Sequence, residues 1–358
     1  MDLQQMRQGM RSAVKPVGPK LTGPKLASTA SPTWWREGLM GLGAVLVVIL
    51  VAFILLAPAK HGAAVAVAAA PVNPDIAEAN GPPTGAPLLW VMKDADTTIY
   101  LFGSVHILRQ KLNWMDARLF KAFDSADEAW FEVPDLDHLP AFKGFSGSVF
   151  AAKPVLLNGL SDTEKNQLKI LMARYNYTLD EVARVKPEAM AQFVKQLDQM
   201  GGGFSIQRGA DFTLFHRARD MKKKTAGFES YREHYGYLYQ MQALGDDGTE
   251  DLKDALAAHF GTGSSDSDIN VMVKYWRTGD QKAITDLVAR QKADEPGVND
   301  ILLVQRNQKW LPRIETMMQA RGTVFITVGA AHLVGPDGLV AQLRARGHVV
   351  TRLDPGKA

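Results

Sequence analysis

The chain of 358 residues contains no cysteine. Disulfide bonds, thiol nucleophiles, iron–sulfur clusters and cysteine-ligated zinc are therefore excluded. Any metal ion must be bound by histidine, aspartate or glutamate side chains. The sequence also lacks a His-Glu-x-x-His motif, a Gly-x-Ser-x-Gly motif, a phosphate-binding loop and a Gly-x-Gly-x-x-Gly motif. These absences argue against nucleotide binding and serine hydrolysis.

A strong charge of either sign is missing from most of the chain. The whole sequence has 41 Lys or Arg and 38 Asp or Glu, and residues 1–60 hold seven of the basic and two of the acidic side chains. The remaining residues therefore hold 34 basic and 36 acidic side chains, a net charge of −2. This balance provides no positive surface for a polyanion, so we expect no nucleic-acid partner.

One long apolar run is present near the N-terminus. Residues 38–57, GLMGLGAVLVVILVAFILLA, contain no charged side chain. A helix of this length spans about 30 Å, the thickness of the hydrocarbon core of a bilayer, so we expect the lipid bilayer to be a partner of this segment. Because basic side chains precede the run, the positive-inside rule places residues 1–36 in the cytoplasm. We predict a transmembrane anchor over residues 37–58 in a bacterial inner membrane, with the main domain in the periplasm. A cleaved signal peptide is the alternative, because small residues near Ala70 offer a cleavage site.

The rest of the chain predicts a tether and one domain. Residues 59–87 are rich in Ala and Pro, which predicts a disordered tether, and a folded domain is predicted over residues 88–355. Strand patterns occur at 89–92, 98–102, 128–133, 323–328 and 348–353. Helical patterns occur at 115–125, 161–175, 178–184, 187–200, 211–221, 231–243, 249–259, 267–277, 280–292, 298–320 and 337–345. We predict an α/β (α+β) fold whose central sheet is built from N- and C-terminal strand and helix units, with a large helical insertion between them.

Two short stretches of this domain repeat one pattern. IYLFGSVHIL and FITVGAAHLV each contain an apolar run and then Gly-x-x-His, with Gly103 and His106 in the first and Gly329 and His332 in the second. In an open α/β sheet, ligands bind beyond the carboxyl ends of the strands. Glycine permits either a positive φ angle or a close approach to the backbone. We predict that the two turns face one another across a shared site.

Glu132 lies at the end of a third strand pattern, in WFEV, among apolar side chains. An unpaired carboxylate is costly in such surroundings, so a cationic or metal partner is expected. Two imidazoles and one carboxylate are a common ligand set for a divalent transition metal. We predict that His106, Glu132 and His332 bind a metal ion that activates water. The alternatives are that each histidine is a surface or core residue and that Glu132 caps a loop or binds an arginine.

Polar residues also occur inside two helical patterns. Arg306 and Asn307 are adjacent in LLVQRNQKW. Because two neighbouring residues do not share one buried helix face, we expect one of them to reach the site; a solvated face is the alternative. His234 lies in FESYREHYGYLYQM, where the aromatic spacing indicates a packed helix face.

Several of these stretches resemble the TraB/GumN family, which is similar to the Tiki metalloproteases and more distantly to erythromycin esterase-like and haem-uptake proteins. The resemblance covers about residues 88–353 and rests on LFGSVHIL, WFEV, GADFTLFHRA, GFES, YWRTGD, RNQKW and FITVGAAHLVGPDGL. It implies a metal-dependent hydrolase site built from the two Gly-x-x-His motifs and Glu132. Glu229, Arg306 and Asn307 match family positions, which implies that they support the site or orient the substrate.

The resemblance implies a peptidase-like hydrolase that uses a divalent metal cation, with manganese, cobalt and zinc as candidates, and acts on a peptide or small-molecule substrate. The sequence departs from the family in GFES and REHYGYL, where relatives more usually have Leu-Glu-Thr and a Glu-Gln pair; His234 is part of this departure. The alternative function is a non-catalytic protein that binds haem or a small peptide in the same two-histidine cleft, since imidazoles serve as axial ligands of haem iron.

Overall fold

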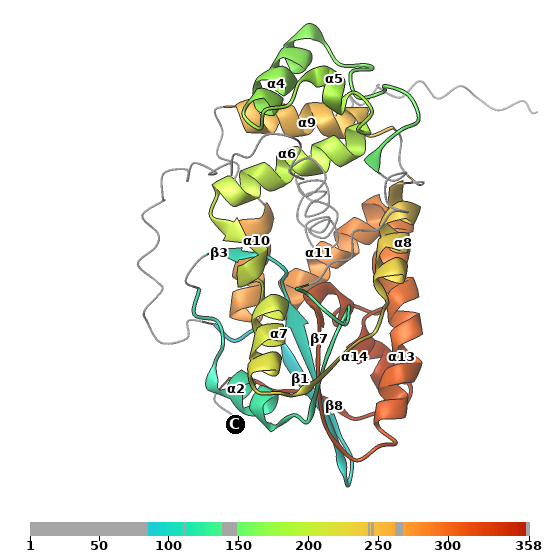
Figure 1. Ribbon diagram of the computed structural model, residues 1–358. Helices are drawn as coiled ribbons and strands as arrows, with labels where there is room; N and C mark the ends of the chain where they lie inside the picture. Colours follow the sequence, from blue (N-terminus) through green and yellow to red (C-terminus); the bar gives the residue numbers. More distant parts are fainter. Residues whose placement is uncertain are drawn as a thin grey trace, which may run out of the picture. The chain divides into compact units, whose positions relative to one another are not determined.

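A six-stranded sheet lies at the centre of the fold, with the strand order β6-β4-β7-β2-β1-β8 (Figure 1). The strands are β1 (Leu89–Lys93), β2 (Thr97–Ser104), β4 (Glu128–Phe131), β6 (Lys224–Gly227), β7 (Gly322–Gly329) and β8 (Val350–Arg352). Strands β6, β4, β7 and β2 are parallel to one another, whereas β1 is antiparallel to both β2 and β8. A mostly parallel sheet built from both ends of the domain confirms the predicted α/β class.

The computed structural model describes residues 85–109, 112–137, 149–242, 244, 247–261 and 268–355. Within these ranges, no helix combines the length and the apolar character needed to cross a bilayer. The predicted cytoplasmic tail (1–36) and transmembrane anchor (37–58) lie outside the described residues. All of the predicted tether (59–87) except its last three residues lies outside them as well.

The two central strands bring the repeated motifs together. Most side chains of β2 and β7 are buried, as expected of parallel strands that are covered on both faces. Their parallel register pairs Ser104 with Gly329. The strands therefore end side by side, and the turns that contain His106 and His332 leave the sheet at the same edge.

Helices cover both faces of the sheet (Figure 1). They are α2 (Ala117–Ser125), α7 (Ala210–Asp220), α10 (Asp268–Thr278), α11 (Gln281–Asp294), α13 (Gln305–Met317) and α14 (Leu339–Ala345). On one face, Phe123 of α2 contacts Phe325 of β7, with 5.0 Å between ring centroids. On the other face, Trp310 of α13 stacks on Phe228, which follows β6, with 5.3 Å between ring centroids. The sheet is thus the middle of three layers.

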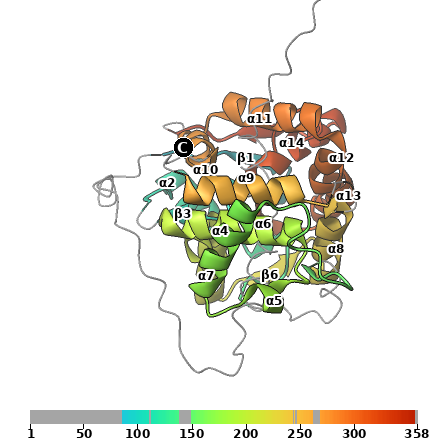
Figure 2. The same cartoon turned by 90° about the horizontal axis from the view of Figure 1, so that it is seen from above.

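The predicted helical insertion has a hydrophobic core of its own. Its helices are α4 (Asp162–Ala173), α5 (Leu179–Val182), α6 (Pro187–Gly201) and α9 (Thr249–Phe260). Ser161 and Thr178 begin α4 and α5 with capping boxes, in which each hydroxyl accepts a hydrogen bond from the backbone N–H three residues later. Figure 2 shows α6 and α9 side by side. After α6 the chain forms β5 (Phe204–Ser205), which pairs with β3 (Leu108–Arg109) beyond the end of β2.

The structure divides the long helix that we predicted over residues 298–320. The segment consists of α12 (Pro296–Asn299), a π-helical turn η5 (Asp300–Val304) and α13. The N–H of Gln305 donates to the carbonyl of Asp300, five residues earlier, which makes this turn wider than an α-helical one. The remaining elements are the helix α8 (Tyr231–Gln242) and two short turns of helix, η4 (Ile206–Arg208) and η6 (Ala330–His332).

Candidate functional site

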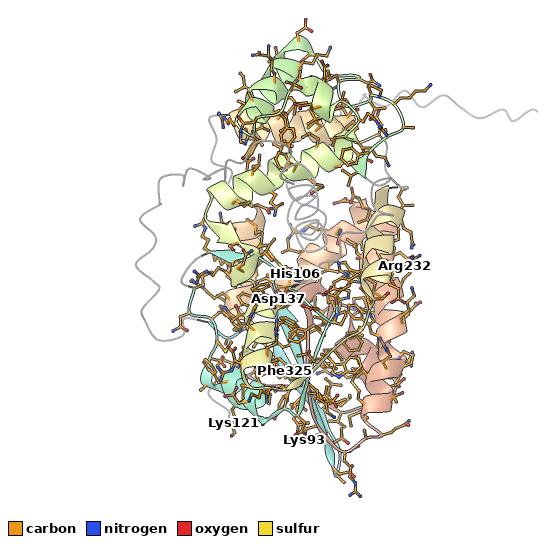
Figure 3. The ribbon with its side chains drawn as sticks, in the orientation of Figure 1. Lys93, His106, Lys121, Asp137, Arg232 and Phe325 are labelled. Carbon is orange, nitrogen blue, oxygen red and sulfur yellow. The ribbon has the colours of Figure 1, made fainter. Side chains whose placement is uncertain are left out.

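His106 follows β2, and a carboxylate from another helix fixes its imidazole. Its Nδ1 atom lies 2.8 Å from Oδ2 of Asp211, in the first turn of α7. Because a carboxylate accepts hydrogen bonds, Nδ1 carries a proton and Nε2 points away from Asp211. The His106 side chain is 15% exposed. Figure 3 shows this residue beyond the end of the sheet, with Phe325 within the sheet.

Gly209 allows α7 to pack against the turn that contains His106. The N–H of Ala210 donates to the carbonyl of Val105 at 2.8 Å, and a Cβ atom on Gly209 would overlap the carbonyl oxygen of His106. We expect Gly209→Ala to lower the free energy of unfolding by about 1–3 kcal/mol, because the backbone must move. Urea denaturation measures the change, with Gly236→Ala as control, since a Cβ there has no neighbour within 4 Å. Unchanged stability in G209A would show that the turn does not need this close approach.

His332 is the last residue of η6, directly after β7, and an amide fixes its ring. Nδ1 of His332 lies 2.8 Å from Oδ1 of Asn307. The amide nitrogen of Asn307 donates to the carbonyls of His332 and Asp337 at 3.2 and 3.0 Å, so its oxygen is the acceptor for the ring. Nδ1 of His332 therefore carries the proton, and Nε2 is the nitrogen with the lone pair, which faces Nη1 of Arg306 at 3.1 Å.

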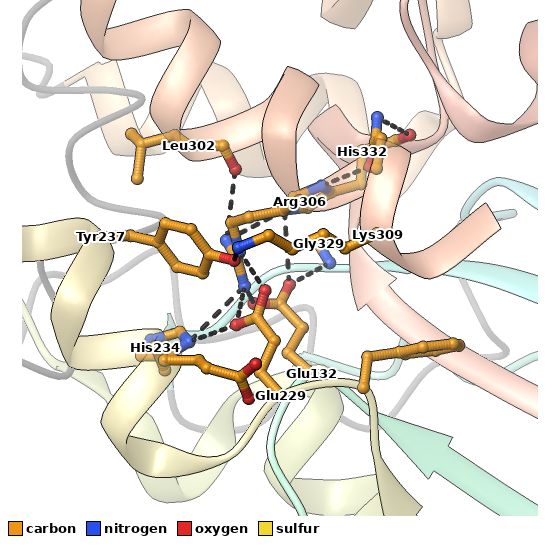
Figure 4. Close-up of polar contacts among 12 residues, drawn as sticks. Glu132, Glu229, His234, Tyr237, Leu302, Arg306, Lys309, Gly329 and His332 are labelled. Carbon is orange, nitrogen blue, oxygen red and sulfur yellow. Dashed lines mark hydrogen bonds and ion pairs between the residues drawn. The ribbon is translucent and has the colours of Figure 1, made fainter. Parts of the chain in front are cut away.

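Glu132 follows β4, and Figure 4 shows its carboxylate beside Arg306 and Gly329. Its Oε1 accepts a hydrogen bond from the N–H of Gly329 at 2.8 Å. The same oxygen lies 3.9 Å from Nε2 of His106 and 3.8 Å from Nε2 of His332. The structure thus brings together the three residues that the sequence singled out, around one carboxylate oxygen.

Glycine in the two motifs allows a close approach to the backbone, which is one of the two explanations given for it above; the other was a positive φ angle. A Cβ on Gly103 would lie 3.0 Å from Cα of Ala330, and one on Gly329 would lie 3.3 Å from Oε1 of Glu132. Neither glycine has a positive φ angle. The first glycine therefore lets the two turns touch, and the second lets a carboxylate approach the backbone.

The guanidinium of Arg306 is buried between two carboxylates (Figure 4). Its Nη2 donates to Oε2 of Glu132 at 2.6 Å, and Nε and Nη2 donate to the two oxygens of Glu229 at 2.7 and 3.0 Å. Its Nη1 lies 3.1 Å from Nε2 of His332. Arg306 is thus a cationic partner of Glu132, as expected for a carboxylate among apolar side chains. This agrees with the alternative hypothesis that Glu132 binds an arginine.

His234 contributes to the same buried cluster. Its Nδ1 lies 3.1 Å from Oε2 of Glu229, and the residue is 5% exposed. The helical aromatic spacing correctly indicated a buried position. It did not indicate the polar contact, because Glu229 belongs to the segment before the helix and its orientation follows from a tertiary contact, the hydrogen bond from its N–H to the carbonyl of Glu132.

The expectation that only one of Arg306 and Asn307 reaches the site is wrong. Both residues are buried, at 4% and 2% exposure. The ring of His332 lies between them, with Nε2 near Arg306 and Nδ1 bound to Asn307. Two side chains that diverge by about 100° around the helix can therefore serve the same imidazole from different sides.

The charges of this cluster shift the pKa values of His106, Glu132 and His332. Burial lowers the pKa of His106, but the charge and hydrogen bond of Asp211 and the charge of Glu132 outweigh it and raise the pKa to about 9. Burial raises the pKa of Glu132, yet Arg306 and then the neighbouring histidines hold it well below its usual range. Burial and the charge of Arg306 hold the pKa of His332 well below its usual value. At neutral pH, His106 is cationic, His332 neutral and Glu132 ionised.

Asp211 is the site residue that the sequence reasoning missed. Its stretch, GADFTLFHRA, supported the family resemblance, and we assigned no role to the aspartate. The sequence did offer one signal for this residue: Asp211 lies in the first turn of a helix that begins directly after Gly209. No local pattern connects it with His106, which lies 105 positions earlier.

The donor atoms suit a divalent metal ion in kind, although their spacing is wide. Within the part of the chain that the structure describes, no group of three or more His, Asp or Glu side chains is close enough to hold a metal ion. Tetrahedral ligands at about 2.1 Å from a metal lie roughly 3.4 Å apart, compared with 3.9 and 3.8 Å from Glu132 to the two histidines. Both Nδ1 atoms already bind a fixed acceptor, which is the usual arrangement for metal-binding histidines.

Comparisons with known proteins agree with the family resemblance. A family model described as the TraB/PrgY/gumN family matches residues 88–352. The chain is similar to an uncharacterized protein of Treponema pallidum (strain Nichols), with 21% identity over 283 residues, 72% of this chain and 80% of the relative. No solved structure matches the chain.

Proposed function

We propose that this chain, which belongs to the TraB/PrgY/gumN family, is a hydrolase whose reacting groups are His106, Glu132 and His332. One observation carries the proposal. The two histidines direct their Nε2 atoms toward a single oxygen of a buried carboxylate, at 3.9 and 3.8 Å. Histidines with a purely structural role would already be satisfied by Asp211 and Asn307 and would not need to converge.

We propose further that these three side chains hold a divalent cation, with manganese, cobalt and zinc as candidates. When bound, the cation would supply a water molecule of lowered pKa that attacks a carbonyl carbon. Asp211 and Asn307 fix both imidazoles, so little ordering is needed to present Nε2. Because the pKa of His106 is about 9, this residue must release its Nε2 proton before Nε2 can bind a cation.

Peptide bonds are the proposed target, and the periplasm is the proposed location. The substrate proposal is supported by the sequence motifs, which resemble those of a family similar to the Tiki metalloproteases. The location is supported by the apolar run at residues 38–57 and the basic residues before it, which would tether the hydrolase to a bacterial inner membrane.

The test compares metal content and peptide hydrolysis in the full-length chain and its variants. His106→Ala and His332→Ala each remove one Nε2 atom. We expect one equivalent of manganese, cobalt or zinc in the parent, less than a tenth of it in either variant, and loss of hydrolysis in parallel. His348→Ala is the matched control, because this histidine contacts Glu315 outside the cluster, and thermal unfolding verifies that each variant folds. Unchanged metal content and hydrolysis in both site variants would refute the proposal.

The absorption spectrum of the same preparation tests the alternative function. A hydrolase of the proposed kind contains no haem and shows no Soret band. A Soret band that disappears in His106→Ala and His332→Ala would instead identify the histidines as haem ligands.

A further inference from the structure

The guanidinium of Arg306 uses all of its N–H groups inside the protein. Nε and Nη2 donate to Glu229 at 2.7 and 3.0 Å, and Nη2 also donates to Oε2 of Glu132 at 2.6 Å. Nη1 donates to the carbonyl of Leu302 at 3.3 Å and lies 3.1 Å from Nε2 of His332. Because a guanidinium has five N–H groups, each of them has one acceptor among the described residues.

The contact between Arg306 and His332 is a hydrogen bond whose direction follows from the tautomer of the ring. Because Nδ1 of His332 donates its proton to Asn307, Nε2 is the acceptor and Nη1 of Arg306 is the donor. Arg306 and His332 are both buried, so water does not compete for this bond. The lone pair of Nε2 is therefore engaged by Arg306.

A cation bound as proposed above would need the same lone pair. Nε2 of His332 lies 3.8 Å from Oε1 of Glu132, the oxygen that also faces Nε2 of His106 at 3.9 Å. Gly329 leaves space beside this oxygen, because a Cβ atom built on it would lie 3.3 Å from Oε1 of Glu132 and 3.7 Å from Nε2 of His106. An imidazole nitrogen has a single lone pair, so it cannot bind a cation and accept from Arg306 at the same time.

We propose that Arg306 and a divalent cation compete for Nε2 of His332, an inference that rests on the hydrolase proposal. In the cation-free chain, Arg306 caps this ligand atom. When the cation binds, Nη1 gives up His332 and keeps its bond to the carbonyl of Leu302. The bonds of the guanidinium to Glu132 and Glu229 stay in place. Arg306 thus limits how tightly the site holds its cation, in addition to neutralising the two carboxylates.

The variant Arg306→Lys separates this competition from the effect of charge. The lysine ammonium keeps the positive charge, but it is one compact nitrogen, whereas the guanidinium reaches its acceptors with three. We expect Nζ to lie between the carboxylates of Glu132 and Glu229, which attract it more strongly than the neutral imidazole of His332 does. Because a hydrogen bond from a charged donor is worth at least a tenfold change in affinity, the dissociation constant for zinc should fall at least about tenfold. Replacement of a residue that only supports the site would weaken zinc binding instead.

Zinc binding to the full-length chain is measured by equilibrium dialysis against a zinc buffer at one fixed pH. Arg313→Lys is the matched control, because it is the same exchange on the same helix and Arg313 donates to the carbonyls of Gly227 and Phe228 instead. Its dissociation constant for zinc should equal that of the parent. In the parent, nitrogen-15 NMR follows Nη1 of Arg306 and Nε2 of His332 during the titration, and we expect both signals to move with the same midpoint as zinc binding.

Two outcomes would overturn the competition and leave the hydrolase proposal in place. Zinc that binds to the parent while the Arg306 signal stays unchanged would show that His332 keeps its hydrogen bond. A folded R306K variant with equal or weaker zinc binding would make Arg306 a support of the site only. If R306K does not fold, the NMR titration of the parent decides alone. Absence of bound zinc in every folded form, the parent included, would refute both proposals.

Discussion

Replacing Arg306 with leucine is expected to lower the free energy of unfolding by about 3–5 kcal/mol at pH 8, because removal of one partner from a buried ion pair costs this much. The variant leaves Glu132 and Glu229 without the guanidinium that donates to both. These carboxylates are 8% and 4% exposed, so water cannot replace the lost charge. Urea denaturation in the presence of a chelator measures the loss.

The decrease in the free energy of unfolding caused by Arg306→Leu should be smaller at pH 5 than at pH 8. Burial raises the pKa of Glu132, and Arg306 is the strongest of the charges that lower it, so the pKa rises when the guanidinium is removed. A carboxyl whose folded pKa lies above its unfolded value stabilises the fold at low pH, and that contribution disappears as the pH rises. Arg346→Leu is the control, because its ion pair with Glu315 is exposed and contributes less than about 1 kcal/mol. An equal loss at both pH values would contradict this assignment of charges.

The second large effect is a dependence of stability on pH that originates at His106. Its pKa is about 9 in the folded chain and 6.5 as the ordinary value, a difference worth on the order of 3 kcal/mol. Because the folded pKa is the higher one, this stabilisation is complete below pH 6.5 and is lost as the pH rises to 9. His332 and Glu132 have lowered pKa values and lose their contributions as the pH falls. The metal-free chain should therefore be most stable near pH 6.5.

Variants of His106 and its partner test this origin. His106→Gln should remove most of the decline in unfolding free energy between pH 6.5 and 9, measured by urea denaturation with a chelator present. Asp211→Asn should reduce the decline as well, because Asp211 supplies the largest of the effects that raise the pKa of His106. His348→Gln, at a histidine paired with Glu315, should retain it. A decline that persists in H106Q would assign the effect to another group.

The sequence was sufficient for strands β1, β2, β4, β7 and β8 and for the location of the histidines. Apolar runs followed by glycine marked β2 and β7, and the rule that ligands bind beyond the carboxyl ends of strands placed His106 and His332 at one edge. The parallel pairing of β2 with β7 was not readable from the sequence, because nothing local specifies which strand is the neighbour. The pairing of Ser104 with Gly329 brings the two turns together.

The contacts that orient the site were the part that could not be predicted. Asp211 holds the imidazole of His106 from a helix 105 positions later, and Asn307 holds that of His332 from the helix before β7. Periodicity identifies which face of a helix is buried, and it does not identify the polar group against which a buried side chain will pack. The same limit applied to His234, which the aromatic pattern placed in a packed helix face and the structure places against Glu229.

The adjacency of β2 and β7 also determines when the site can exist during synthesis. A nascent chain acquires His106 and Glu132 early, and at that stage neither the neighbouring strand (residues 322–329) nor His332 has been made. The candidate site is completed only when residues 322–332 have been synthesised. A truncated product that ends before Gly322 would keep the residues of the helical insertion with its separate core and would lack the strand and the histidine that complete the candidate site.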